Sequence, residues 1–531
     1  MIQKITNTIL FGVGALLLQS CGGEATKPQG KTGKPNVLFI SVDDLNDWTG
    51  VSKGHPDVKT PNLERLAQRG VYFTNAHASV AVCTPSRLAV LSSLAPTTTG
   101  CYTNKSGTRN MNIWNEVNLL PVHMRQNGYY TMACGKIEGH ACWEIEEKFE
   151  HQKLWDERKP RAYALTEKLI IDGNRYGAPD FYPFPMGGSG TVKYNKEHGT
   201  NFPGFSLCAG PIDREYLPEG KMPDELNVEW AIEKLQKDYD KPFMLGVGFL
   251  RPHVPYTAPR EYFDMYPLDQ IEVPNAIEDE FADIPIYGKA MAEGITEPGA
   301  EHIVRTLGED YRKQLVQGYL ASITFMDAQL GKLLDALDNS KHGKNTIIVL
   351  WSDHGQCFGE KMNWRKNNMW NEATVAPMLW VVPGVTDGGQ VNKNAVSLLD
   401  IYPTLSGLCE LKESKQQDGE DILPLLQDMN VKRKNPVVST WTYGSHSIRR
   451  DNWRYIRYND GSEELYDELK DYGEHTNLAG NPEYKNVIEN LKKYLPKDIY
   501  QPTDKNKEYH MINDRVERWT RNPKSMPDYL N

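Results

Sequence analysis

The chain has 531 residues, of which 39% are hydrophobic and 24% charged, and these proportions are ordinary for a soluble globular protein. Its 60 basic and 70 acidic residues give a formal net charge of −10. A nucleic-acid-binding protein needs a basic surface, so the charge argues against that class, and any site for an anion must be locally basic.

The first residues have the features of an export signal. Lys4 precedes an apolar run at residues 9–18, which is too short to span a membrane. Residues 18–21 (Leu-Gln-Ser-Cys) resemble a bacterial lipobox, in which the cysteine is lipidated and becomes N-terminal. We therefore expect a signal peptide at residues 1–20, lipidation of Cys21 and a polar tether at 21–34, with a plain signal peptide as the alternative. The expected location is the bacterial periplasm or outer-membrane surface, with a lipid anchor as the only membrane contact.

Predicted strands and helices alternate along the part of the chain that follows the tether. Apolar runs predict buried strands, and apolar residues at three- and four-residue spacing predict helices. In chain order the expected elements are a strand at 36–42, helices at 61–70 and 86–94, a strand at 243–249, a helix at 311–337 and a strand at 346–351. This order predicts an α/β domain over residues 35–430, with a large, mostly parallel central sheet flanked by helices.

Two stretches, 144–218 and 277–310, are poor in apolar periodicity and are expected to be long irregular insertions. The pattern changes near residue 430. Residues 447–458 predict a strand, 459–461 a tight turn, 464–466 a return strand and 486–495 a helix. Residues 431–531 are therefore expected to form a smaller α+β C-terminal subdomain.

Polar residues follow each of the three predicted strands. Asp43 and Asp44 follow the first strand, His253 follows the second, and Asp353 and His354 follow the third. Ligands bind open α/β sheets at this carboxyl edge. Carboxylates from two strand ends can hold a hard divalent cation, although each pair taken alone could be a helix cap or a solvated turn.

The sharpest motif is Cys-Thr-Pro-Ser-Arg at residues 83–87. It resembles the signature of type I sulfatases, in which a sulfatase-maturating enzyme oxidises the cysteine to formylglycine (3-oxoalanine). The hydrated aldehyde offers two hydroxyls on one carbon. One attacks sulfur and releases the alcohol, and the other expels sulfate by regenerating the aldehyde. The alternative is a buried structural thiol beside a proline turn.

The resemblance extends from about residue 35 to about residue 495 and is closest to the iduronate-2-sulfatase branch. Further matching segments lie at residues 60–62, 128–136, 251–253, 352–355, 464–467 and 474–478. The resemblance implies an alkaline-phosphatase-like fold, with a short antiparallel sheet in the C-terminal subdomain. It also implies hydrolysis of sulfate esters on a sulfated saccharide, either a glycosaminoglycan uronate 2-sulfate or an algal polysaccharide.

Residue roles follow from the same resemblance. The implied ligands of one calcium ion are Asp43, Asp44, modified Cys83, Asp353 and His354. The implied catalytic residues are Cys83, Arg87, Lys136, His140, His253 and Lys366, and the implied substrate-binding residues are Lys136, His253, Lys366 and His446. His140 lies one position later than the matching histidine of the branch, which leaves its role as the base open. Calcium prefers oxygen ligands, so His354 could instead orient a carboxylate from outside the ligand set.

Two other functions stay open from the sequence. One is a phosphonate or phosphodiester hydrolase of the same superfamily. The other is a lipoprotein that binds glycans without turnover, which predicts an unmodified Cys83.

Overall fold

The computed structural model describes residues 33–104, 110–160, 170–171, 174–175, 190–200, 207–274, 281–294, 296–412, 414, 417–501 and 507–530. The expected signal peptide, Cys21 and all but the last two residues of the tether lie outside these ranges. Residues from Gly33 onward form one compact unit. In the described part of the chain, no helix combines the length and the apolar character needed to cross a bilayer.

The largest sheet has eight strands in the order β15-β2-β14-β11-β1-β9-β4-β5. Their bounds are Gln390–Asn392, Val71–Phe73, Met378–Val381, Thr346–Ser352, Asn36–Asp43, Phe243–Pro252, Tyr130–Gly135 and Glu157–Arg158. β14 runs antiparallel to β11 and β2, and the other neighbours are parallel. The predicted large, mostly parallel sheet is confirmed.

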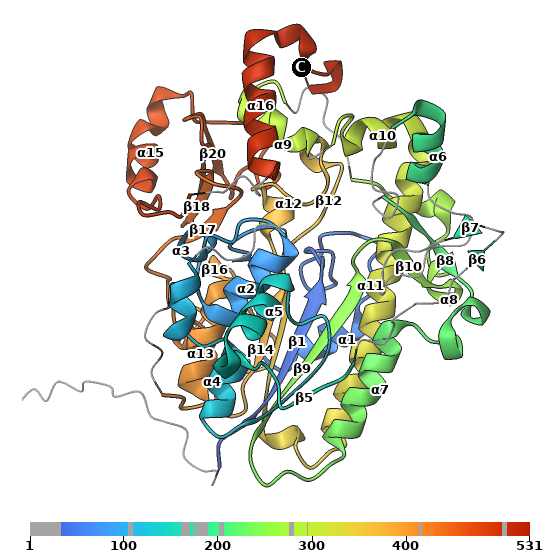
Figure 1. The fold of residues 1–531 in the computed structure, drawn as a ribbon, viewed down its shortest axis with the longest axis vertical. Coiled ribbons are helices and arrows are strands. Elements are labelled where there is room, and N and C mark those ends of the chain that lie inside the picture. The colour runs from blue at the N-terminus through green and yellow to red at the C-terminus, as the bar shows by residue number, and fades with distance from the viewer. Residues whose placement is uncertain are drawn as a thin grey trace, which may run out of the picture. The chain divides into compact units, whose positions relative to one another are not determined.

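Helices cover both faces of this sheet because alternate side chains of each strand point to opposite sides. Leu38 and Ile40 of β1 pack in one core with α1 (Pro61–Ala67), α7 (Pro223–Leu235) and α11 (Glu309–Asp338). Val37 and Phe39 pack in a second core. Its helices are α2 (Cys83–Ser92), α4 (Leu120–Gln126), α5 (His140–Lys148) and α13 (Ile401–Leu408). Figure 1 shows β1 and β9 between these two groups of helices.

The C-terminal region contains a four-stranded antiparallel sheet of β17 (Val437–Thr440), β18 (His446–Arg450), β19 (Trp453–Arg457) and β20 (Glu463–Asp467). One face packs on α15 (Lys485–Lys492). The prediction of a single strand over 447–458 was wrong, because the chain turns at Asp451, whose φ of 56° is the left-handed conformation that Asp tolerates in turns.

The stretch 277–310 was expected to be irregular, and this was also wrong. It contains α9 (Ile286–Glu293) and α10 (Ala300–Leu307). Both helices are short and end at glycines with positive φ, Gly294 and Gly308, so the apolar repeat is too brief to stand out in the sequence. In the stretch 144–218, the described residues include α6 (Gly190–His198) and β8 (Ala209–Ile212).

Candidate active site

The carboxyl ends of three adjacent strands bring the predicted acidic residues together. β1 lies between β11 and β9, with Val42 opposite Ser352 and Asp43 opposite Pro252. Asp43 and Asp44 therefore lie beside Asp353, and all three carboxylates are fully buried. The backbone N–H of Asp44 donates to Oδ1 of Asp353 at 3.0 Å.

Cys83 lies against this acidic group. It is the first residue of α2, and the preceding Val82 has an extended backbone. Its Sγ lies 3.2 Å from Nζ of Lys366, 3.4 Å from Nε2 of His354 and 3.9 Å from Oδ1 of Asp44. Burial alone would raise the pKa of the Cys83 thiol, but the lysines beside it hold that pKa well below the usual value.

Arg87 joins two of the carboxylates. One turn after Cys83 on α2, its Nη2 donates to Oδ1 of Asp43 and its Nε to Oδ2 of Asp353, each at 3.0 Å. Its Nη1 also donates to the carbonyl of Lys136 at 2.5 Å. Burial opposes a charge here, but the two carboxylates raise the pKa of Arg87. A planar, permanently charged guanidinium suits this bridging position.

Two lysines complete the charge balance. Lys136 follows β4 and its Nζ lies 2.5 Å from Oδ2 of Asp43. Lys366 pairs with Asp44 and is almost fully buried. Burial disfavours its charge, but Asp44 and Cys83 raise the pKa of Lys366, so it stays protonated at neutral pH. Arg87, Lys136 and Lys366 therefore balance the charges of Asp43, Asp44 and Asp353, and place cationic groups beside Cys83 within an acidic protein.

The donor set fits a divalent cation. Ligand atoms of Asp44, Cys83, Asp353 and His354 all lie within 4.8 Å of one another, and Asp43, Asp44 and His253 form a second such group. Oδ2 of Asp44 is buried without a hydrogen-bond partner. Burial raises the pKa of Asp353 to about 7 despite Arg87. A bound cation would satisfy the first atom and favour the charged form of the second.

Two histidines are oriented by backbone carbonyls. Nδ1 of His354 donates to the carbonyl of Gly355 at 3.0 Å, and Nδ1 of His253 donates to that of Val254 at 2.7 Å. Their Nε2 atoms therefore face the acidic group, at 3.4 Å and 3.8 Å from the carboxylate of Asp44. Such carbonyl contacts fix the ring nitrogen available for proton transfer or metal binding.

The structure leaves two other predicted histidines less defined. His140 begins α5, is exposed and contacts the ring of Trp143. The preceding Gly139 lies against Thr84, so this loop borders the Cys83 turn. His446 begins β18, is buried, and its Nδ1 lies 3.0 Å from Oγ1 of Thr440. Burial lowers the pKa of His446 to about 4. Their roles stay predictions.

Sequence reasoning missed several residues that hold this site. Tyr319 of α11 donates its hydroxyl to the carbonyl of Asp44 at 2.7 Å and accepts from the N–H of Asn46 at 3.0 Å. Ser86 donates to the carbonyl of Asp353 at 2.5 Å. Asp224, at the start of α7, accepts the N–H groups of the two residues that precede Pro252. Ser86 lies inside the Cys-Thr-Pro-Ser-Arg motif, which could have drawn attention to it, whereas Tyr319 has the spacing of an ordinary core residue.

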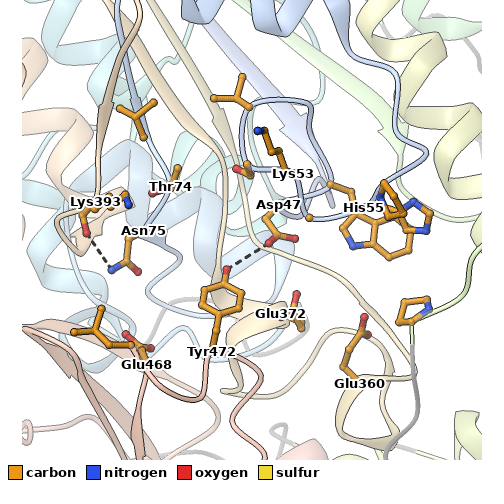
Figure 2. A pocket seen from close by; sticks show the side chains of 18 of the residues that line it. Asp47, Lys53, His55, Thr74, Asn75, Glu360, Glu372, Lys393, Glu468 and Tyr472 are labelled. Atoms are coloured by element: carbon orange, nitrogen blue, oxygen red, sulfur yellow. Dashed lines mark hydrogen bonds between the residues drawn. The ribbon is translucent and has the colours of Figure 1, made fainter.

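A wide cleft lies outside this group. It has a volume of about 890 Å³, and none of the predicted catalytic residues lines it. Its walls carry several acidic side chains. Figure 2 shows that Asp47 accepts a hydrogen bond from the hydroxyl of Tyr472, near Glu372. Burial raises the pKa of Asp47 to about 6.

Comparisons with known proteins agree with this geometry. A family model described as Sulfatase matches residues 35–411, and one described as N-sulphoglucosamine sulphohydrolase, C-terminal, matches residues 359–501. The chain is 36% identical over 498 residues to a sulfatase of Formosa agariphila, covering 91% of each protein. It is 30% identical over 444 residues to human iduronate 2-sulfatase, covering 76% of this chain and 74% of the relative.

Two solved structures share the fold. The first is the structure of a protein in complex with its substrate D-glucosamine-2-N,6-O-disulfate. It has a TM-score of 0.65 at 17% sequence identity, and the match covers 93% of this chain and 100% of that protein's chain. The second, the phosphonate monoester hydrolase of Agrobacterium radiobacter, has a TM-score of 0.64 at 20% sequence identity. That match covers 87% of this chain and 95% of the hydrolase chain. The predicted alkaline-phosphatase-like fold is confirmed. The chain belongs to the sulfatase family, and it is a sulfatase.

Proposed function

We propose that this chain removes sulfate from a sulfated saccharide, using a formylglycine made from Cys83 and one calcium ion. The observation that carries the proposal is the position of Cys83, within 3.9 Å of Asp44 and 3.4 Å of His354, beside a set of buried carboxylates. The proposed calcium ligands are Asp43, Asp44, Asp353 and His354, together with the modified side chain.

The two groups supply distinct chemistry. A hydrated formylglycine supplies a nucleophilic hydroxyl together with a second hydroxyl for release of sulfate. Calcium supplies positive charge to sulfate oxygens and favours ionisation of that nucleophile. Side chains of this protein bind the sulfate, position the carboxylates and transfer the proton.

Lys366 contacts Cys83 and Lys136 pairs with the neighbouring Asp43, so both lysines are suited to hold sulfate oxygens, on which negative charge grows as the ester bond breaks. Arg87 fixes the carboxylates of Asp43 and Asp353 and favours their charged forms. His253 presents Nε2 toward the site and can donate a proton to the departing sugar oxygen, which is a poor leaving group when unprotonated.

The substrate class is proposed from the names of relatives. Human iduronate 2-sulfatase is 30% identical, and an ulvan-active sulfatase of Formosa agariphila is 26% identical over 510 residues. The first name specifies iduronate 2-sulfate and the second specifies ulvan. We therefore propose a glycosaminoglycan uronate 2-sulfate or an algal oligosaccharide as substrate, with His446 as a further binding residue.

The cellular setting is part of the same proposal. The leader at residues 1–20 and Cys21 predict an exported, lipid-anchored protein, at the periplasmic face or the cell surface. A sulfatase-maturating enzyme is the partner required for conversion of Cys83.

The test is sulfate release by enzyme made together with a maturating enzyme. The panel contains iduronate 2-sulfate disaccharides, ulvan oligosaccharides, an aryl sulfate, a phosphodiester and a phosphonate monoester. We expect a kcat/KM at least about 100-fold higher on one sulfated saccharide than on both phosphorus esters. Preference for a phosphorus ester would overturn the proposal. Binding of saccharides without turnover by fully converted enzyme would overturn it as well.

A further inference from the structure

The segment that carries Lys366 has an unusual backbone. We call residues 361–371 the Lys366 segment. Four of its non-glycine residues have positive φ: Lys361 at 50°, Met362 at 45°, Arg365 at 89° and Asn367 at 76°. Residues with a Cβ rarely adopt this conformation, and it persists only where surrounding contacts impose it.

One residue of the C-terminal region fastens both ends of the Lys366 segment. The backbone carbonyl of Glu474 accepts from the ammonium of Lys361. The Oε2 atom of Glu474 accepts from the backbone N–H of Asn371 at 2.9 Å. The remaining oxygen, Oε1, pairs with Arg454 of β19. Because Glu474 is 1% exposed, water cannot replace these partners.

A second contact joins the same two parts of the chain. Glu464 of β20 is fully buried and accepts from the indole Nε1 of Trp370 at 3.0 Å. The hydroxyls of Tyr458 and Tyr466 also donate to Glu464. Glu464 therefore holds a side chain of the Lys366 segment, whereas Glu474 holds its backbone.

We propose that Glu474 is a positioning residue that keeps Lys366 against residue 83 by fixing both ends of a strained segment. The proposal rests on the proposed function, because it assumes that Lys366 acts on the sulfate. It also gives a function to the C-terminal motif at residues 474–478. The C-terminal region then contributes to catalysis through the shape of the Lys366 segment.

The main test is a double-mutant cycle of Glu474→Gln and Lys366→Gln, measured as kcat/KM on the sulfated substrate. Gln keeps the size of Glu474 but cannot accept from both Arg454 and Asn371. We expect Glu474→Gln alone to lower kcat/KM at least about tenfold, and to change it less than about twofold when Lys366 is already replaced. Equal losses in both backgrounds, or no loss in either, would overturn the proposal.

Two further variants separate positioning from stability. Lys361→Met removes the other attachment but leaves the Glu474–Arg454 pair intact, and it should show the same dependence on Lys366. Asp400→Asn disrupts a comparable buried pair, with Arg433, away from the Lys366 segment. It should lower the melting temperature and leave kcat/KM unchanged. If Asp400→Asn lowers kcat/KM as much as Glu474→Gln, the effect is general destabilisation and the proposal fails.

Hydrogen exchange gives a readout that does not depend on activity. Glu474→Gln should speed exchange of the amides in residues 367–371, and leave those of β1 and β11 unchanged. Unchanged exchange in 367–371 would overturn the proposal. If Lys366→Gln itself keeps full activity, the role given to Lys366 under the proposed function is wrong, while exchange still reports whether Glu474 holds the segment.

Discussion

Replacing Tyr319 by phenylalanine tests how the long helix α11 supports the site. Its hydroxyl donates to the carbonyl of Asp44 and accepts from the N–H of Asn46, and the side chain is fully buried. Asp44 has a φ of 64°, so its backbone depends on such contacts. Tyr319→Phe removes the hydroxyl, changes little volume and leaves both backbone groups buried without their partner.

Each buried group left without a partner costs about 1–3 kcal/mol, so the loss of the partner of two groups should lower the free energy of unfolding by about 2–6 kcal/mol. A less fixed Asp44 should also weaken calcium binding, and a loss of about 1.4 kcal/mol corresponds to a tenfold higher Kd. Thermal denaturation with and without calcium measures the first effect, and calorimetric titration of calcium into metal-free protein measures the second.

The control is Tyr262→Phe. Tyr262 lies on α8 (Arg260–Phe263) and packs on Phe325 of the same helix α11, with ring centroids 5.3 Å apart. This variant should keep the calcium Kd of the parent protein. If Tyr319→Phe also keeps the parent melting temperature and calcium Kd, the hydroxyl does not hold Asp44 and the reasoning is refuted.

Three further predictions concern Cys83, Arg87 and Asp47. Cys83→Ala should keep the parent melting temperature within a few degrees and lower kcat/KM at least about 1,000-fold, as sulfate release will show. Arg87→Lys should lower the free energy of unfolding by about 3 kcal/mol in chelator, because a lysine cannot pair with both Asp43 and Asp353; an unchanged denaturation curve would contradict this. Burial raises the pKa of Asp47 from 3.8 to about 6, so the folded protein binds more protons than the unfolded chain between these values, and stability falls as the pH rises through them. The Asp47→Asn variant should therefore have a higher melting temperature than the parent at pH 7 and the same melting temperature below about pH 4, as thermal scans across this range will show. Equal melting temperatures of the two proteins at both pH values would contradict the pKa shift.

The strand ends of the site could be predicted from sequence because parallel strands place their carboxyl ends at one edge. Asp43, Asp44 and Asp353 follow apolar runs long enough to be buried strands, so their meeting is a consequence of topology. Arg87 lies one helical turn after Cys83, and its direction toward the same edge follows from the placement of α2.

Other parts of the site depend on contacts that no local pattern encodes. Tyr319 has the spacing of a core residue, and only packing of α11 on the strand ends brings its hydroxyl to Asp44. The backbone of the Lys366 segment has positive φ at residues with no glycine signal, because tertiary contacts such as those of Glu474 impose it. The turn at Asp451 was missed since the charged and aromatic residues around it continue a strand-like alternation.

The most direct test of the central claim is the chemical state of residue 83 in active enzyme. Trypsin releases residues 70–87 as one peptide, whose mass distinguishes an aldehyde from a thiol. In protein made with a maturating enzyme, we predict that sulfate release rises in proportion to the fraction of aldehyde in this peptide. Full sulfate release from protein with an unmodified Cys83 would contradict the account, and so would fully converted protein that releases no sulfate in calcium from any sulfated substrate of the panel.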